Sequence, residues 1–182
     1  MYALPRGNPE ARLLCLGEAP GKREGVEHRT FCGPAGQLLD KILAVGKWNT
    51  ATDWLLVNPI SCRPAAPEGS GKENLVPTAE QITACEPFLR FFLTVSDPAI
   101  VVLVGKVATT TMFPQYKDSP MKDLVGKLLY HTEYTGPAFF PIYHPSALLR
   151  AGKGTERYEG LRATTIEHVK TLRELANELG VG

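Results

Sequence analysis

The run of residues 99–104, Ala-Ile-Val-Val-Leu-Val, constrains the fold more than any other part of the chain. Every residue in it is apolar, and most are β-branched. A short continuous run of this kind is typical of a strand that is buried on both faces, as in a parallel sheet with helices above and below it. The sequence therefore predicts a sheet that is covered from both sides.

Three more apolar runs predict the other strands, at residues 12–16, 54–57 and 138–143. Apolar residues recur at helical spacing between and after them, over residues 34–43, 78–94 and 158–179. Strands that alternate with helices favour a three-layer α/β/α fold with a central four-stranded, mostly parallel sheet. The length of 182 residues suits one domain over residues 1–182, in which residues 1–11 form a loose N-terminal arm.

Two connections and one helix carry specific expectations. Residues 17–33 contain several glycines and charged side chains, and residues 62–77 are rich in proline and glycine, so both stretches are expected to be loops. Thr78 and Gln81 match a capping box that starts the following helix. Pro87 lies inside that helix and predicts a kink or a local break there.

Composition bounds the class of protein. A hydrophobic content of 43% and a charged content of 21% are those of an ordinary globular domain. No apolar run is long enough to span a membrane, and the first residues lack the apolar core of a signal peptide, so we expect a cytoplasmic protein with no membrane partner. We also expect a monomer. The net charge of +1 argues against a large non-specific nucleic-acid footprint, but it allows a small basic rim that includes Arg63.

Polar side chains follow three of the predicted strands at the point where each strand ends. Glu18 follows the first strand, Asn58 the second and His144 the last. Because the carboxyl ends of parallel strands meet at one edge of a sheet, we expect these side chains to converge there. Phe31 lies in the 17–33 loop, close enough in sequence to join them.

These residue types suit one kind of chemistry. The amide of Asn58 offers a donor and an acceptor, which matches the edge of a base, and Phe31 can stack on a flat ring. His144, held by the following proline, can donate to a developing oxyanion, and Glu18 can orient water or stabilise positive charge on a sugar. Each residue also has a plain structural alternative: a loop-capping carboxylate, a turn, a structural histidine or a core phenylalanine. Together they predict a site that binds a planar heterocycle and stabilises a leaving anion.

Five motifs in the same order resemble a known family. They cover residues 17–21 (Gly-Glu-Ala-Pro-Gly), 31–40, 58–64, 78–89 and 144–150. The chain resembles the uracil-DNA glycosylase superfamily, most closely family 4, the bacterial and archaeal iron–sulfur type, over about residues 12–175. The resemblance implies a sheet of four parallel strands between helices. It also implies an enzyme of base excision repair that flips uracil out of DNA and hydrolyses its N-glycosidic bond, leaving an abasic site.

Carried over by motif, the family roles give a catalytic set of Glu18, Asn58 and His144. Phe31 would stack on the base, Asn58 would read its O4/N3 edge, and His144 would stabilise charge on O2 as uracil leaves. Backbone amides from Gly17 to Ala19 would line the base pocket. The resemblance implies DNA contacts by Pro20, Gly21, Ser146 and Arg150, and by either Leu148 or Leu149 as a wedge. Arg63, from the basic rim, is a further expected DNA contact.

Three departures from the family pattern matter. Ala19 stands where the best-known uracil glycosylases have a water-activating Asp, so Glu18 is the nearest acid. The N-terminal C-x-x-C that supplies two ligands of a 4Fe–4S cluster is missing; Cys62 and Cys85 would be the other two ligands, while Cys15 and Cys32 are poorly placed. We therefore expect no cofactor and no metal.

The third departure leaves the substrate open. Residues 22–30 differ from the family pattern near the expected pocket mouth. Residues 22–25 (Lys-Arg-Glu-Gly) replace a more acidic family pattern, and His28 and Thr30 replace a usual glycine and proline. One alternative is therefore a glycosylase for a modified pyrimidine base, as in a phage–host conflict. Another is a non-catalytic DNA- or partner-binding module that kept the fold.

Overall fold

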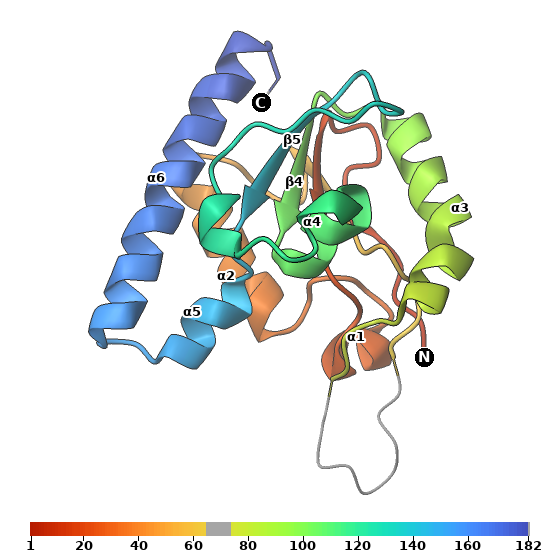
Figure 1. The fold of residues 1–182 in the computed structure, drawn as a ribbon, viewed down its shortest axis with the longest axis horizontal. Helices are drawn as coiled ribbons and strands as arrows, with labels where there is room; N and C mark the ends of the chain where they lie inside the picture. The colour runs from red at the N-terminus through yellow and green to blue at the C-terminus, as the bar shows by residue number, and fades with distance from the viewer. Residues whose placement is uncertain (65–73, 182) are drawn as a thin grey trace, which may run out of the picture.

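The computed structural model describes residues 1–64 and 74–181, which form a five-stranded sheet covered by helices on both faces (Figure 1). The strand order is β1-β3-β2-β4-β5. The bounds are Arg6–Gly7 for β1, Leu13–Leu16 for β2, Trp54–Val57 for β3, Ile100–Val104 for β4 and Ala138–Ile142 for β5. Strands β2 to β5 are parallel and the short β1 runs antiparallel to β3. The predicted four-stranded parallel sheet is confirmed, with one short edge strand added.

The register brings the strand ends level. Leu16 at the end of β2 pairs with Val57 of β3 on one side and with Leu103 of β4 on the other. The residues that follow these strands, among them Gly17 and Asn58, therefore leave the sheet at the same height. This is the physical basis for the convergence of polar side chains at one edge.

Two helices cover each face. Helices α2 (Pro34–Val45) and α6 (Glu156–Glu178) pack on one face, and α3 (Ala79–Ser96) and α4 (Lys106–Met112) pack on the other. Figure 1 shows α6 and α3 at opposite sides of the sheet. Because successive strand residues point to opposite faces, each of the strands β2 to β5 contributes side chains to both cores, which explains why all the residues of β4 are buried.

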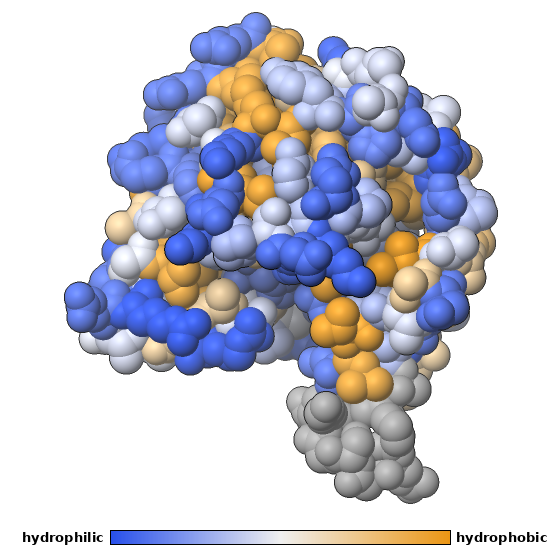
Figure 2. Space-filling model, viewed as in Figure 1, coloured by the Kyte–Doolittle hydropathy of each residue, from blue (hydrophilic) through white to orange (hydrophobic). Residues whose placement is uncertain are grey.

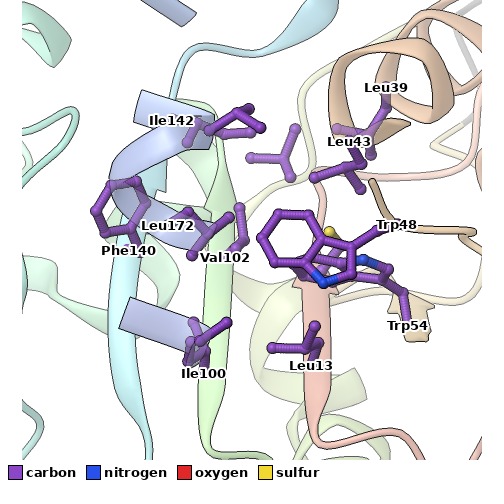
Figure 3. Close-up of a cluster of buried hydrophobic side chains, with 14 of the residues drawn as sticks. Leu13, Leu39, Leu43, Trp48, Trp54, Ile100, Val102, Phe140, Ile142 and Leu172 are labelled. Atoms are coloured by element: carbon purple, nitrogen blue, oxygen red, sulfur yellow. The ribbon is translucent and has the colours of Figure 1, made fainter. Parts of the chain in front are cut away.

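The core on the α2/α6 face is the one drawn in Figure 3. Leu39 and Leu43 from α2 and Leu172 from α6 reach down to the strand side chains, and all three are fully buried. Trp48 packs edge-on against Trp54 of β3, with ring centroids 5.2 Å apart at 89°. Truncating an aromatic residue buried in this way costs about 3–5 kcal/mol, so this layer holds α2 and the pocket loop before it in place.

The helix predictions hold in most respects. The capping box is present, since the Gln81 N–H donates to Thr78 Oγ1 at 3.3 Å and the Thr78 N–H donates to Gln81 Oε1 at 3.0 Å. Of the kink or local break predicted at Pro87, the break is wrong, because α3 continues through Pro87 and buries Leu89 and Leu93 against the sheet; the kink stays a prediction. Of the loop expected at residues 62–77, residues 65–73 lie outside the described residues.

Two predictions about loops are corrected. The arm at residues 1–11 is not loose: it contributes β1, and Ala3 is only 1% exposed. Its backbone groups find partners on neighbouring segments, which composition cannot reveal. The loop at residues 17–33 contains a short helix, α1 (Lys22–Glu27), whose Gly25 is buried against Met1.

The remaining short elements are η1 (Pro114–Tyr116), η2 (Met121–Asp123) and α5 (Pro145–Ala151). Helix α5 starts directly after β5 and leads into α6. Among the helices of the described residues, none is long and apolar enough to cross a membrane.

Candidate active site

A cavity of about 970 Å³ opens at the C-terminal ends of the strands, between α1, the start of α2 and α5. The four residues singled out from the sequence, Glu18, Phe31, Asn58 and His144, all line it. Ala19, Pro20, Gly21, Ser146 and Arg150 line it as well. In Figure 1 the helices α1 and α5 flank this end of the sheet.

Gly17 sets how closely two pocket side chains approach the end of β2. A Cβ atom at this position would lie 2.3 Å from Asn58 Oδ1 and 2.5 Å from Phe31 Cζ, so any side chain would displace both. Phe31 itself is held in the left-handed region with a φ of 53°. Its carbonyl oxygen would lie 1.9 Å from a Cβ at Gly36, so the start of α2 packs directly on its backbone. The aromatic ring is therefore fixed from two sides.

His144 is the N-cap of α5, and its ring has a defined tautomer. Its Nδ1 accepts a hydrogen bond from the Ser146 backbone N–H at 3.1 Å and lies 2.8 Å from Ser146 Oγ. A backbone N–H can only donate, so Nδ1 is unprotonated and the neutral ring carries its proton on Nε2. Burial, and then the charge of Arg150, lower the pKa of His144 from 6.5 to about 4. Near neutral pH the ring is an uncharged Nε2–H donor.

Ser146 links this ring to a cation. Its Oγ accepts a hydrogen bond from Arg150 Nη1 at 2.9 Å, which leaves its hydroxyl proton to donate to His144 Nδ1. Arg150 thus donates to Ser146 and Ser146 donates to His144, so the three side chains form one hydrogen-bonded series that ends at the imidazole. Gly105 completes the support, because a Cβ there would lie 2.7 Å from His144 Cβ.

The carboxylate of Glu18 is half-buried in the cavity wall beside Ala19. Burial raises its pKa, and the nearby Arg150 partly offsets that rise. A second carboxylate, Glu24, accepts a hydrogen bond from the Gly33 N–H at 2.9 Å and so ties α1 to the loop that carries Phe31.

The sequence reasoning missed several residues that line the cavity, among them Glu24, Asn74 and Lys106. Lys106 follows the end of β4 after one glycine, so the strand-end argument used for the other residues would have found it. Asn74 accepts from the Lys22 N–H at 3.1 Å across 52 positions in sequence, and no local pattern signals that contact.

The expected DNA contacts divide into two groups. Pro20, Gly21, Ser146 and Arg150 lie on the cavity, and the region where α5 leads into α6 is strongly hydrophilic in Figure 2. Arg63 is not among the lining residues; its Cδ lies beside Gly25 of α1.

The two leucines offered as a wedge differ in exposure. Leu148 is 2% exposed and Leu149 is 49% exposed. The pair is therefore corrected to Leu149 alone, because α5 turns Leu148 into the protein.

The four cysteines lie in different surroundings. Cys62 is exposed and Cys85 is half-buried, whereas Cys15 is buried within β2, where burial raises the pKa of its thiol. Burial also raises the pKa of the Cys32 thiol, to about 11. Across residues 1–64 and 74–181 no group of three or more His, Cys, Asp or Glu side chains could hold a metal ion.

Fold and site together define an α/β protein with a cavity at the C-terminal ends of its parallel strands. The family model for the uracil DNA glycosylase superfamily matches residues 4–167, and the chain belongs to this superfamily. A type-4 uracil-DNA glycosylase of Sulfurisphaera tokodaii is 32% identical over 174 residues, which cover 93% of this chain and 72% of the relative.

Two other relatives carry the same name. The type-4 uracil-DNA glycosylase of Saccharolobus solfataricus is 32% identical over 79% of this chain, and the matched region spans 64% of that relative, just under two thirds of its length. That of Thermotoga maritima is 28% identical over 96% of this chain and 82% of the relative.

Proposed function

We propose that the chain is a DNA glycosylase that flips uracil out of DNA and hydrolyses its N-glycosidic bond, leaving an abasic site. One observation carries the proposal: Phe31, Asn58 and a neutral His144 with its proton on Nε2 line a single cavity. The relatives named as type-4 uracil-DNA glycosylases support the same conclusion.

The binding step uses the rigid wall of the cavity. The flipped base stacks on Phe31, which is fixed by the start of α2, while the Asn58 amide donates to O4 and accepts from N3–H. Unstacking a base from the duplex costs a few kcal/mol, and these contacts offset that cost. Backbone amides from Gly17 to Ala19 add donors at the end of β2.

The bond-breaking step uses His144. As the C1′–N1 bond lengthens, its electron pair moves onto the base and negative charge gathers on O2. The Nε2–H of the neutral imidazole donates to that oxygen and stabilises the leaving anion without a proton transfer. A donor of this kind contributes roughly 10²–10³ in rate when it meets developing charge in a site that excludes water.

The sugar then carries positive charge at C1′, and water completes the reaction. Oxygen from water bonds to C1′ and one water proton passes to solvent, while the uracil anion takes up a proton from solvent, so the products are uracil and an abasic site. Glu18 is the acid in the cavity nearest to the position held by Ala19, and in its ionised form it stabilises the cationic sugar and orients the water. Its burial strengthens that interaction, because the charges meet in a lower dielectric.

DNA is the partner in this proposal. Pro20, Gly21, Ser146 and Arg150 contact the phosphates around the flipped nucleotide, and Leu149 enters the stack that the base has left. We also propose that the protein acts as a monomer in the cytoplasm, without a metal or cluster.

A modified pyrimidine is a second candidate substrate. The observation that favours it is the position of Lys22, Arg23 and Val26, which line the cavity and belong to the stretch that departs from the family pattern. Substituents on the base that extend toward the mouth would meet these side chains first.

Base release from a panel of oligonucleotides tests these functions together. Matched single- and double-stranded oligonucleotides carry uracil, thymine or a 5-substituted uracil at one position, and released base is identified by mass spectrometry. Release of uracil but not thymine supports the proposal, whereas release of the modified base alone supports the second candidate. Folded protein that binds DNA and releases no base refutes both, as a binding module would.

A further inference from the structure

We propose that the N-terminal segment, residues 1–4, is a positioning element for the base pocket, because it joins the loop that carries Phe31 to the segment that follows Asn58. The inference rests on the proposed function for its role in catalysis. It concerns a stretch of chain that none of the sequence motifs includes.

On one side the N-terminal segment pairs with the chain just after Asn58. Ala3 N–H donates to the Ser61 carbonyl oxygen at 2.8 Å, and Arg63 N–H donates to the Met1 carbonyl oxygen at 2.9 Å. Tyr2 and Cys62 form the antiparallel bridge between these two bonds.

On the other side it pairs with the chain just before Phe31. Leu4 N–H donates to the His28 carbonyl oxygen at 3.0 Å, and Thr30 N–H donates to the Leu4 carbonyl oxygen at 2.9 Å. The His28 ring adds a contact, with its Nδ1 2.9 Å from the Tyr2 carbonyl oxygen and its centroid 4.7 Å from that of the Tyr2 ring.

The segment therefore lies between the chain just before Phe31 and the chain just after Asn58, and it is hydrogen-bonded to both. Thr30 precedes Phe31 directly, and its hydroxyl also donates to the Leu56 carbonyl oxygen at 3.0 Å, which ties the same loop to β3. Ala3, at the centre of the pairing, is 1% exposed, so its bond to Ser61 is shielded from water. A shift of the N-terminal segment would move the stacking ring relative to the base-reading amide.

The geometry distinguishes a positioning role of residues 1–4 from direct contact with the base. The described residues that line the cavity include none from residues 1–4, so the segment does not touch a bound base. Displacing a catalytic arrangement by about 1 Å from a remote site can lower a rate by roughly 10². The effect should therefore fall on kcat, while DNA affinity from the phosphate contacts stays the same.

The test compares Leu4→Pro with Leu4→Ala. Proline removes the N–H that donates to His28 and leaves the rest of the chain intact, whereas alanine keeps that N–H and removes only a side chain that is 58% exposed. We expect kcat for uracil release to fall roughly tenfold or more in Leu4→Pro and to match the wild type in Leu4→Ala. Affinity for uracil-free DNA should be equal in all three proteins. Equal kcat values in the two folded variants would overturn the proposal.

Amide hydrogen exchange provides a readout that does not depend on catalysis. Gly33 N–H is bonded to Glu24 and not to residues 1–4, so it reports whether the pocket loop loosens beyond the bond that was removed. Faster exchange at Gly33 in Leu4→Pro than in Leu4→Ala supports the positioning role, and unchanged exchange there contradicts it. If Leu4→Pro does not fold, Ala3→Pro, which removes the bond to Ser61, is measured in the same way.

The two proposals fail in different ways. A wild-type protein that releases no base refutes the proposed function, while Gly33 exchange in the variants still reports on the N-terminal segment. A wild type that releases uracil, together with a Leu4→Pro variant of normal kcat, refutes the positioning role alone.

Discussion

The protonation of His144 allows the most quantitative prediction. Burial is the main cause of its lowered pKa and the charge of Arg150 is the second, and together they take the value from 6.5 to about 4. Each pKa unit corresponds to about 1.4 kcal/mol, so the folded protein disfavours the imidazolium by about 3 kcal/mol. The ring should therefore stay neutral throughout the range in which the enzyme would work.

An NMR titration of the imidazole from pH 8 to 3.5 measures this value, with the signal assigned by its loss in His144→Gln. We expect a midpoint near pH 4. Arg150→Gln should raise the midpoint but leave it below 6.5, because burial remains. A wild-type midpoint at 6.5 or above would refute the assignment of a neutral donor.

The same difference in pKa links stability to pH. The unfolded chain binds the proton near pH 6.5 and the folded chain only near pH 4, so the unfolded state gains protons first as the pH falls. The contribution of this group is complete above pH 6.5 and is lost between 6.5 and 4, by about 3 kcal/mol in all. Urea unfolding of wild type and His144→Gln at both ends of that range should show this difference.

Three further predictions test the pocket, the wedge and the metal content. Gly17→Ala should lower the rate of uracil release roughly 10²-fold, because the new Cβ would displace the side chains of Phe31 and Asn58. The control Gly160→Ala, whose Cβ meets nothing within 4 Å, should leave the rate unchanged. Equal rates in the two variants would contradict the close packing of the pocket around Gly17. Leu149→Ala should slow release from duplex more than from single strands, and Leu179→Ala, at a similar 46% exposure, should affect neither; an equal effect on both substrates would argue against a wedge. Purified protein should lack iron and absorbance near 400 nm, and stoichiometric iron would contradict the assignment of the cysteines.

The sheet and the polar side chains at its edge could be predicted because local sequence patterns indicate both. Residues 99–104 form a continuous apolar run, and Asn58 and His144 each follow a similar run directly. Once the strands are parallel, the geometry of the sheet brings their ends together without further information. His144 could also have been identified as a helix N-cap, since Pro145 occupies the first position of α5, where proline is favoured.

The N-terminal pairing could not be predicted, because most of its hydrogen bonds join backbone groups. Residues 1–8 show no alternation of apolar and polar side chains and contain Pro5, which weakens any strand pattern. Helix α1 is equally hard to predict from the sequence, because it has only six residues and one of them is Gly25, which disfavours a helix. That glycine is explained only when Met1, far away in sequence, is seen to pack on it.

The rate of uracil release by His144→Ala under single-turnover conditions tests the central claim most directly. If the cavity at the strand ends is where the leaving uracil anion is stabilised, the rate should fall roughly 10²–10³-fold relative to wild type, with unchanged affinity for uracil-free DNA. A rate close to that of the wild type would show that the reaction does not depend on this donor, and the account of the site would be wrong.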